Sequence, residues 1–341
     1  MDTMRFCFIL FILAFSSSSY LYSYEEIRTE RDKGVSLEAD YWGVWRKNLD
    51  GASMFYWSDG AGDLITEIYN SYTFEDTGIV LPAESSFSQI SMKYASGLQL
   101  ALRLSPDPGQ TMEFFYEGLL SWKHSNEVIS DALALAVPTS PYVTNDWSGF
   151  SWGKYNYKSE FDSYELSYWC HITPQRVDYF SFSVMGGLRI VDFCDEVRIC
   201  NYKLGNRNTY EVKVRNLPIG PQAGIDFQNN PWGQFTWAIK FKAGIYANII
   251  DKDLELFDNG NTDLITADTI EKVQLSYIIE FSPAIYYRFK PFYFTVAYDF
   301  FSFYNVAFAP YQIERTVSLN SILSSRRLRF DGFSAGLGAI F

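Results

Sequence analysis

Apolar and polar residues alternate along much of the chain with a period of two. In "VQLSYIIEFSPAIYYRF", residues 273–289, the odd-numbered positions are all aliphatic, aromatic or proline, and the even-numbered positions are mixed. The stretch "FTWAIKFKAGIYANII", residues 235–250, has the same arrangement, with Lys240 and Lys242 on its mixed face. Because successive side chains of a β-strand point to opposite faces, each stretch predicts a strand with one apolar and one mixed face.

This pattern recurs and predicts about ten antiparallel strands that run up and down in sequence order. The predicted strands are 35–45, 94–104, 112–123, 163–172, 179–190, 217–227, 235–250, 273–289, 292–301 and 330–341. A further hairpin around "ASMFYW", within residues 46–89, would raise the number to twelve.

The connections between these strands alternate in length. The short ones each contain Pro or Gly, as expected of tight turns, and they lie at 105–110, 173–178, 229–234 and 288–291. The long ones are polar and often acidic, and they lie at about 125–159, 194–208, 251–272 and 306–324. The sequence therefore predicts tight turns at one end of the molecule and long loops at the other.

The two strand faces favour a transmembrane barrel over a soluble β-protein. The mixed face carries many glycines beside its charges, which suits a crowded interior better than a solvated surface, and the apolar face is large and aromatic. Lipid offers no hydrogen bonds to the backbone, so that only helices and closed barrels cross it. We therefore predict an all-β, antiparallel up-and-down transmembrane β-barrel of about ten strands, or alternatively twelve.

The N-terminal residues have the layout of a secretory signal peptide. Arg5 precedes about ten apolar residues and then a run of serines, and no later stretch approaches the ~18 apolar residues of a spanning helix. We predict a signal peptide at 1–19 with cleavage between 19 and 24, a mobile segment at 24–34, and the barrel at 35–341.

Four segments of the second half carry a family resemblance. "SYELSYW", "GGLRIVDF", "NLPIGPQAGIDFQ" and "KFKAGIYANI", within residues 158–341, resemble the C-terminal half of outer-membrane β-barrel porins of the major outer membrane protein-like family. The resemblance implies a porin-like role at the cell outer membrane and supplies no catalytic residues. The last strand, with the terminal Phe341, is similar to the signal that such proteins present to the outer-membrane assembly machinery.

The charged residues of the mixed face are the candidate functional residues. They would project into the lumen and line a pore: Lys93, Arg103, Glu113, Glu117, Lys123, Glu165, Arg189, Lys240, Lys242, Glu280 and Asp299. Such charges either pair across the barrel and close it, or line a water-filled path and select ions. We expect a porin-like channel for small solutes or ions; the alternative is a plugged structural or surface-interaction barrel that acts through its long loops.

The sequence contains few residues that suit a disulfide, a catalytic site or a metal site. Cys194 and Cys200 are a candidate disulfide, with unpaired thiols as the alternative. His124 and His171 lack the arrangement of a catalytic site, and we expect no enzymatic activity and no cofactor. Loop 251–272 is acidic but lacks the EF-hand spacing, which predicts no metal site. The net charge of −12 argues against nucleic acid as a partner and leaves lipid, lipopolysaccharide and small solutes, with the oligomeric state open.

Overall fold

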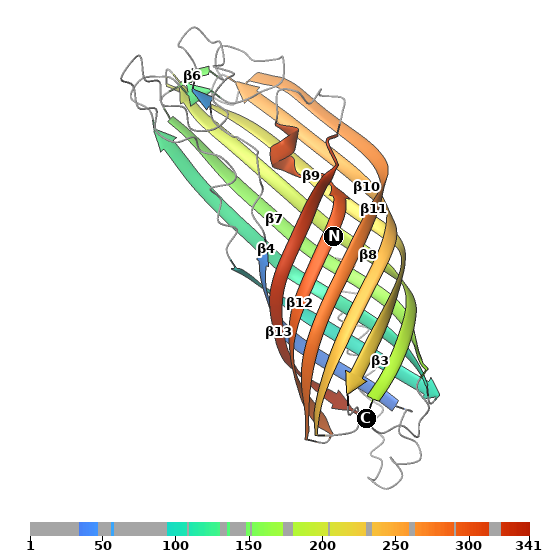
Figure 1. Cartoon of the computed structure of the whole chain (residues 1–341). Helices are drawn as coiled ribbons and strands as arrows, with labels where there is room; N and C mark the ends of the chain where they lie inside the picture. Colours follow the sequence, from blue (N-terminus) through green and yellow to red (C-terminus); the bar gives the residue numbers. More distant parts are fainter. Residues whose placement is uncertain are drawn as a thin grey trace, which may run out of the picture.

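The computed structural model describes residues 34–46, 56–57, 94–107, 109–129, 135–136, 148–150, 152–172, 180–203, 205–229, 234–258, 263–289, 291–313 and 322–341. Ten of its strands form a closed antiparallel barrel, in the order β1-β13-β12-β11-β10-β9-β8-β7-β4-β3 (Figure 1). Their bounds are β1 Gly34–Arg46, β3 Tyr94–Asp107, β4 Gln110–Ile129, β7 Trp152–His171, β8 Phe180–Lys203, β9 Asn206–Asn229, β10 Phe235–Asp258, β11 Asp263–Phe289, β12 Phe292–Val306 and β13 Arg326–Ile340.

The prediction of a ten-stranded up-and-down barrel is confirmed. The possible extra hairpin is instead part of a separate small sheet, in which β2 (Tyr56–Trp57) pairs with β5 (Leu135–Ala136), and β5 pairs with β6 (Ser148–Phe150). Within the described residues, no helix is long and apolar enough to cross a membrane. The predicted signal peptide, its cleavage site and Lys93 lie outside the described residues.

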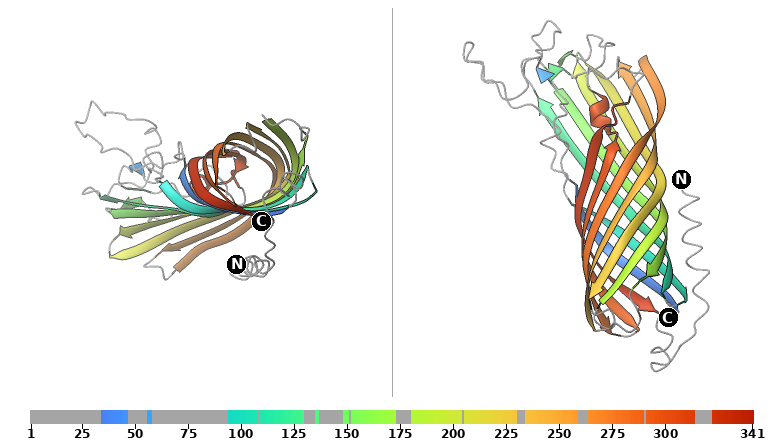
Figure 2. Two further views of the ribbon diagram at one scale, coloured as in Figure 1. Left: turned by 90° about the horizontal axis from the view of Figure 1, so that it is seen from below. Right: turned by 45° about the vertical axis from the view of Figure 1, so that its right-hand side comes forward.

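Strands β8 to β11 are much longer than predicted. β8 and β9 are joined between Lys203 and Asn206, and β10 and β11 between Asp258 and Asp263. The regions 194–208 and 251–272, which we expected to be long loops, are therefore mostly paired strand. Figure 2 shows these strands continuing away from the closed ring of the barrel.

A reversal of polarity along the long strands explains this extension. Near the short turns, the outward side chains are apolar, but they become charged at Asp192 of β8, Arg215 of β9 and Asp251 of β10. The inward side chains change in the opposite sense, for example from Arg189 to Val191. We call the part beyond this change the overhang, which comprises residues 152–161, 191–203, 206–216 and 250–258. The overhang has the polarity of a water-soluble sheet, apolar inside and charged outside.

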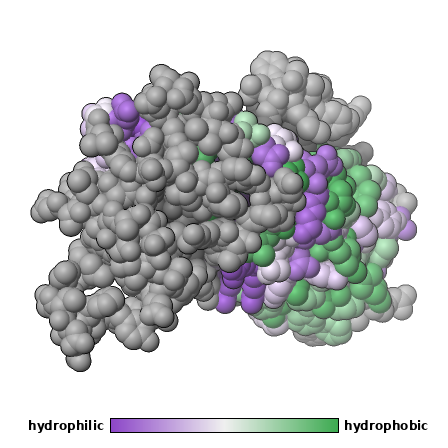
Figure 3. Space-filling model, turned by 90° about the horizontal axis from the view of Figure 1, so that it is seen from above, coloured by the Kyte–Doolittle hydropathy of each residue, from purple (hydrophilic) through white to green (hydrophobic). Residues whose placement is uncertain are grey.

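The remaining part has the polarity of a membrane-spanning wall. In β8, residues 180–190 separate the turn end from the reversal, a length that matches the ~9 to 11 residues of a tilted transmembrane strand. Seen from above, the visible flank carries both hydrophilic patches and broad areas of apolar side chains (Figure 3). The change from an apolar to a charged exterior thus marks one border of the apolar wall.

A β-bulge in β4 changes which side chains face inward. The pairing of β4 with β7 shifts between Glu117 and Leu120, and Leu119 has a φ of 60°. Beyond the bulge, Leu120 and Trp122 are buried inside, and Lys123 is exposed outside. The prediction that Lys123 faces the lumen is therefore wrong, because one extra residue reverses the alternation of the strand.

A glycine lets β9 and β10 approach each other closely. A Cβ atom at Gly220 would lie 2.2 Å from the carbonyl oxygen of Ile245 and 2.8 Å from the Cα of Tyr246, whereas a Cβ at Gly186 would meet nothing within 4 Å. We expect Gly220→Ala to lower the free energy of unfolding by about 1 to 3 kcal/mol. Urea unfolding followed by tryptophan fluorescence measures the change, with Gly186→Ala as the control. Equal stability of the two variants would contradict the close approach.

Candidate functional site in the barrel lumen

The lumen between the short turns and the overhang contains three groups of ion-paired residues. In the first, Arg103 lies between two glutamates, with 2.6 Å from Nη1 to Glu38 Oε2 and 2.6 Å from Nε to Glu113 Oε2. Tyr293 donates a hydrogen bond to Glu38 at 3.0 Å, and Trp169 donates one to Glu113 at 3.1 Å. Both carboxylates are almost fully buried. Because Glu38 belongs to β1 and Glu113 to β4, Arg103 is held by both strands.

The second group connects β10 to β7. The Nζ of Lys242 lies 2.9 Å and 2.7 Å from the two carboxylate oxygens of Glu165, and Ser167 donates a further hydrogen bond to Glu165. The ammonium group also lies 4.9 Å from the ring centroid of Phe115. These contacts connect β10 and β7 across the lumen, although the two strands are not neighbours in the barrel.

The third group is centred on Arg189 of β8, whose side chain is fully buried. Its guanidinium donates to Glu117 of β4 and to Glu280 of β11, and its Nε donates to Ser163 at 2.8 Å. The ring of Phe301 lies 5.3 Å from the guanidinium carbon. One arginine therefore ties together four strands across the barrel.

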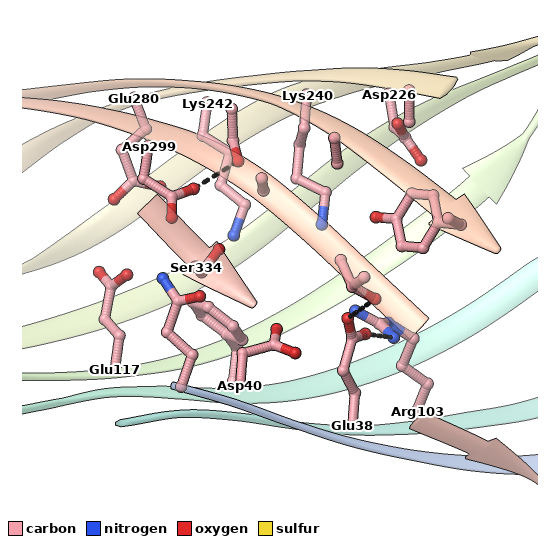
Figure 4. Close-up of a pocket in the computed structure, with 18 residues that line it drawn as sticks. Glu38, Asp40, Arg103, Glu117, Asp226, Lys240, Lys242, Glu280, Asp299 and Ser334 are labelled. Atoms are coloured by element: carbon pink, nitrogen blue, oxygen red, sulfur yellow. Dashed lines mark hydrogen bonds and ion pairs between the residues drawn. The ribbon is translucent and has the colours of Figure 1, made fainter. Parts of the chain in front are cut away.

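A small cavity of about 70 Å³ lies among these groups (Figure 4). Asp40 and Asp299 line it, and each has one buried carboxylate oxygen without a hydrogen-bond partner among the described residues. Asp299 accepts one hydrogen bond from Ser282 at 2.5 Å. In the described part of the chain, no group of three or more His, Cys, Asp or Glu residues is arranged to hold a metal ion.

Above the charged groups the lumen is filled by hydrophobic side chains. All ten barrel strands contribute to one contiguous buried cluster. Phe161 lies at its centre, with ring centroids 6.3 Å from Trp42, 5.3 Å from Phe301 and 5.2 Å from Phe330, and Trp122 stacks on Phe330 at 5.0 Å. Phe161 has no exposed surface. The lining of a water-filled pore would be accessible, whereas the side chains of this cluster are buried.

A buried chain segment adds to this closure. Residues 306–313, which we call the inner segment, include the short 3-10 helix η4 (Ala309–Gln312), and all of them are buried. Figures 1 and 2 show the helix inside the outline of the barrel. Asn216 of β9 donates to Ala307 O at 2.8 Å and accepts from Ala307 N at 2.9 Å. The predicted loop 306–324 thus begins as a segment folded inward.

A buried ion pair holds the same segment from the other side. Arg46 of β1 lies 3.3 Å from Asp195 of β8, and both side chains have no exposed surface. Asp195 also accepts hydrogen bonds from Ala309 N at 3.0 Å and from the hydroxyl of Tyr157. One carboxylate therefore fixes three different parts of the chain.

The structure places most of the predicted lumen residues inside the barrel. Those inside are Arg103, Glu113, Glu117, Glu165, Arg189, Lys240, Lys242, Glu280 and Asp299. Their role in lining a conducting pore stays a prediction. Three further lumen residues were not predicted from the sequence, although they lie at inward positions of predicted strands: Glu38, Asp40 and Asp226. Alternation with outward Leu37, Ala39 and Tyr41 could have identified the first two.

The candidate disulfide is not formed. Cys194 and Cys200 are free, and both lie on β8, opposite Arg215 and Thr209 of β9. Two residues six positions apart on a strand are about 20 Å apart, whereas bonded cysteines have Cα atoms within about 7 Å of each other. The segment that we interpreted as a loop is extended strand, so that the two thiols cannot meet.

The two histidines have structural neighbours. The ring of His124 stacks on Tyr155 with centroids 5.9 Å apart. His171 contacts Thr111 at 3.3 Å and Ser183 at 2.6 Å. The two histidines thus contact different residues and not each other.

No protein-family model matches the chain, and no curated protein matches it. Among solved structures, the outer membrane protease OmpT from Escherichia coli is similar over 95% of this chain and 100% of its own, with 10% identity and a TM-score of 0.47. A FadL homologue from Pseudomonas aeruginosa is similar over 91% of this chain and 90% of its own, with 8% identity and a TM-score of 0.27. The toluene transporter TbuX from Ralstonia pickettii has 7% identity and a TM-score of 0.22, over 90% of this chain and 89% of its own.

These neighbours correct one expectation. We expected no enzymatic activity, but the first of these barrels is a protease. The expectation of no enzymatic activity is therefore withdrawn. At these identities and TM-scores, the comparison assigns neither the protease activity nor a transported compound to this chain.

Proposed function

We propose that this protein is a closed β-barrel of the outer membrane that acts through its overhang, as a structural or surface-interaction protein. The observation that carries the proposal is the buried hydrophobic cluster to which all ten strands contribute. It supports the plugged alternative over the porin-like channel. The outer-membrane location and contacts with lipopolysaccharide and the assembly machinery belong to the same proposal, and the apolar exterior below the overhang supports them.

The overhang supports this function because it combines a rigid core with a polar exterior. Its outer face carries ion pairs such as Arg198–Glu211 and Arg215–Asp192, at 2.6 Å and 2.8 Å. Its inner face is packed, with Val197, Ile199 and Val212 fully buried. Such an arrangement presents a stable charged surface to the medium without requiring passage through the lumen.

Conductance tests the proposal. Purified protein refolded into a planar lipid bilayer is expected to show no channel steps, because buried side chains from all ten strands pack together inside the barrel. Reproducible steps from correctly folded protein would overturn the closed-barrel proposal and favour the porin-like channel. Folding of the sample is checked by its heat-dependent mobility in gel electrophoresis.

A further inference from the structure

The outer face of β13 carries two arginines just beyond the apolar wall. In residues 333–341 every outward side chain is apolar, and this stretch matches the ~9 residues of a tilted transmembrane strand. The next outward positions, counted away from the short turns, are Asp331, Arg329 and Arg327. The exterior of β13 therefore changes from apolar to charged, as it does along the long strands.

Each arginine packs on an aromatic ring of β12. The guanidinium carbon of Arg327 lies 4.7 Å from the ring centroid of Tyr304, and that of Arg329 lies 4.7 Å from the ring centroid of Phe300. The Nε of Arg327 also donates a hydrogen bond to Ser302 at 2.7 Å. A guanidinium held on a ring keeps N–H donors at its edge, where a ligand can reach them. We call Arg327, Arg329, Tyr304 and Phe300 the arginine patch.

Both arginines retain hydrogen-bond donors for a ligand. Arg327 is exposed, and within the described residues it forms no ion pair. Arg329 contacts one carboxylate in the described part of the chain, that of Asp331, through Nη2 at 3.1 Å. Arg215 of β9, in contrast, donates from Nε and Nη2 to the two oxygens of Asp192, at 2.9 Å and 2.8 Å. The donors that Arg215 gives to a carboxylate are therefore largely unused in the arginine patch.

The surroundings of the arginine patch are apolar and aromatic. Across β12, the residues level with the two arginines are Tyr277 and Ile279 of β11. Toward the short turns, the exposed ring of Phe333 has its centroid 5.1 Å from that of Tyr298 and 6.1 Å from that of Trp45. Aromatic residues of this kind gather where a membrane meets water. The arginine patch therefore lies at the height of lipid headgroups.

The charge and spacing of the two arginines select a phosphate group as their ligand. Two positive charges face the single aspartate, so that the patch favours an anion although the chain has a net charge of −12. Side chains two positions apart on a strand are ~7 Å apart, so that one phosphate between the two guanidinium groups can contact both. Arginine forms paired hydrogen bonds with phosphate oxygens, and basic residues at a membrane surface attract anionic headgroups.

The apolar wall beside the patch selects the source of this phosphate. A free phosphate ion would use the arginines alone, whereas a phosphorylated lipid also places its acyl chains along the exposed apolar side chains of the wall. We propose that the arginine patch binds a phosphate group of lipid A, the membrane anchor of lipopolysaccharide, through Arg327 and Arg329. This inference rests on the proposed outer-membrane location and names a site for the contact with lipopolysaccharide.

Calorimetric titration of the refolded, detergent-solubilised full chain tests the role of the phosphate. The probes are diphosphorylated lipid A in the same detergent, the same lipid after enzymatic removal of its phosphates, and inorganic phosphate. We expect the phosphorylated lipid to bind at least tenfold more tightly than either of the others, because it alone engages both the arginines and the wall. Equally tight binding of either other probe, or no binding of phosphorylated lipid A, would overturn the proposal.

Variants test the assigned residues. Arg327→Gln and Arg329→Gln are each expected to weaken the binding of phosphorylated lipid A at least fivefold and to leave that of the dephosphorylated lipid unchanged. Arg215→Gln, which removes an outward arginine already paired with Asp192, is the matched control and should leave binding unchanged. Unchanged binding in both patch variants, or an equal loss in the control, would refute the assignment. Because lipid binding in detergent does not depend on a closed lumen, this titration and the conductance test can fail independently.

Discussion

Replacing Arg189 by methionine is expected to lower the free energy of unfolding of the barrel by about 3 to 5 kcal/mol. The side chain of Arg189 is fully buried, and its loss leaves Glu117 and Glu280 without their shared counter-charge. An unpaired buried charge is far costlier than the absence of the whole group. Urea unfolding of the refolded protein, followed by tryptophan fluorescence, measures the difference.

Two further variants separate the ion pairing from the volume of the side chain. Adding Glu117→Gln and Glu280→Gln to Arg189→Met removes all three charges and is expected to recover most of the lost stability. Arg198→Met, on the same strand, breaks an exposed pair with Glu211 and should cost less than about 1 kcal/mol. A triple variant as unstable as Arg189→Met would show that packing, not charge, holds this part of the lumen.

Asp195→Ala is the second change with a large expected effect, again about 3 to 5 kcal/mol of destabilisation. It leaves the guanidinium of Arg46 buried without a counter-charge and removes the acceptor of Ala309 N. Because the inner segment is attached at that point, we also expect faster cleavage by chymotrypsin at Phe308 and Tyr311. Both stability and cleavage are measured on the refolded protein.

The neighbouring Asp192 gives the control for this change. It pairs with Arg215 at 2.8 Å on the outer face of β8, where the arginine side chain is 40% exposed. Asp192→Ala should therefore change stability by less than about 1 kcal/mol and leave cleavage of the inner segment unchanged. Similar effects of the two aspartate variants would contradict the role given to the buried pair.

The half of the fold near the short turns could be predicted from the sequence because its pattern is simple. An apolar outer face and a mixed inner face identify each strand near the short turns, and they place Arg103, Glu165 and Lys242 inside correctly. The pattern fails to predict the inward side chains in β4, because the bulge at Leu119 inserts one extra residue and the alternation of the sequence gives no sign of it.

The overhang was missed for a different reason. In "IIDKDLEL", residues 249–256, the period of two persists, but the apolar side chains Ile250, Leu254 and Leu256 now point inward and the acids point outward. A search for strands with an apolar outer face therefore interprets this stretch as an acidic loop. Ion pairs between distant strands, such as Arg189 with Glu280, could not be predicted at all, because they depend on the curvature of the closed barrel.

The pairing of β1 with β13 has a kinetic consequence. Val35 and Phe341 exchange two backbone hydrogen bonds, at 3.1 Å and 2.8 Å, at the seam where the first and last barrel strands meet. Contacts between such distant parts of a chain require a long loop to close before they contribute any stability, which slows folding. Until residues 326–340 pair with both of their neighbours, β1 and β12 each keep one open edge, and the arrival of this last strand closes the ring.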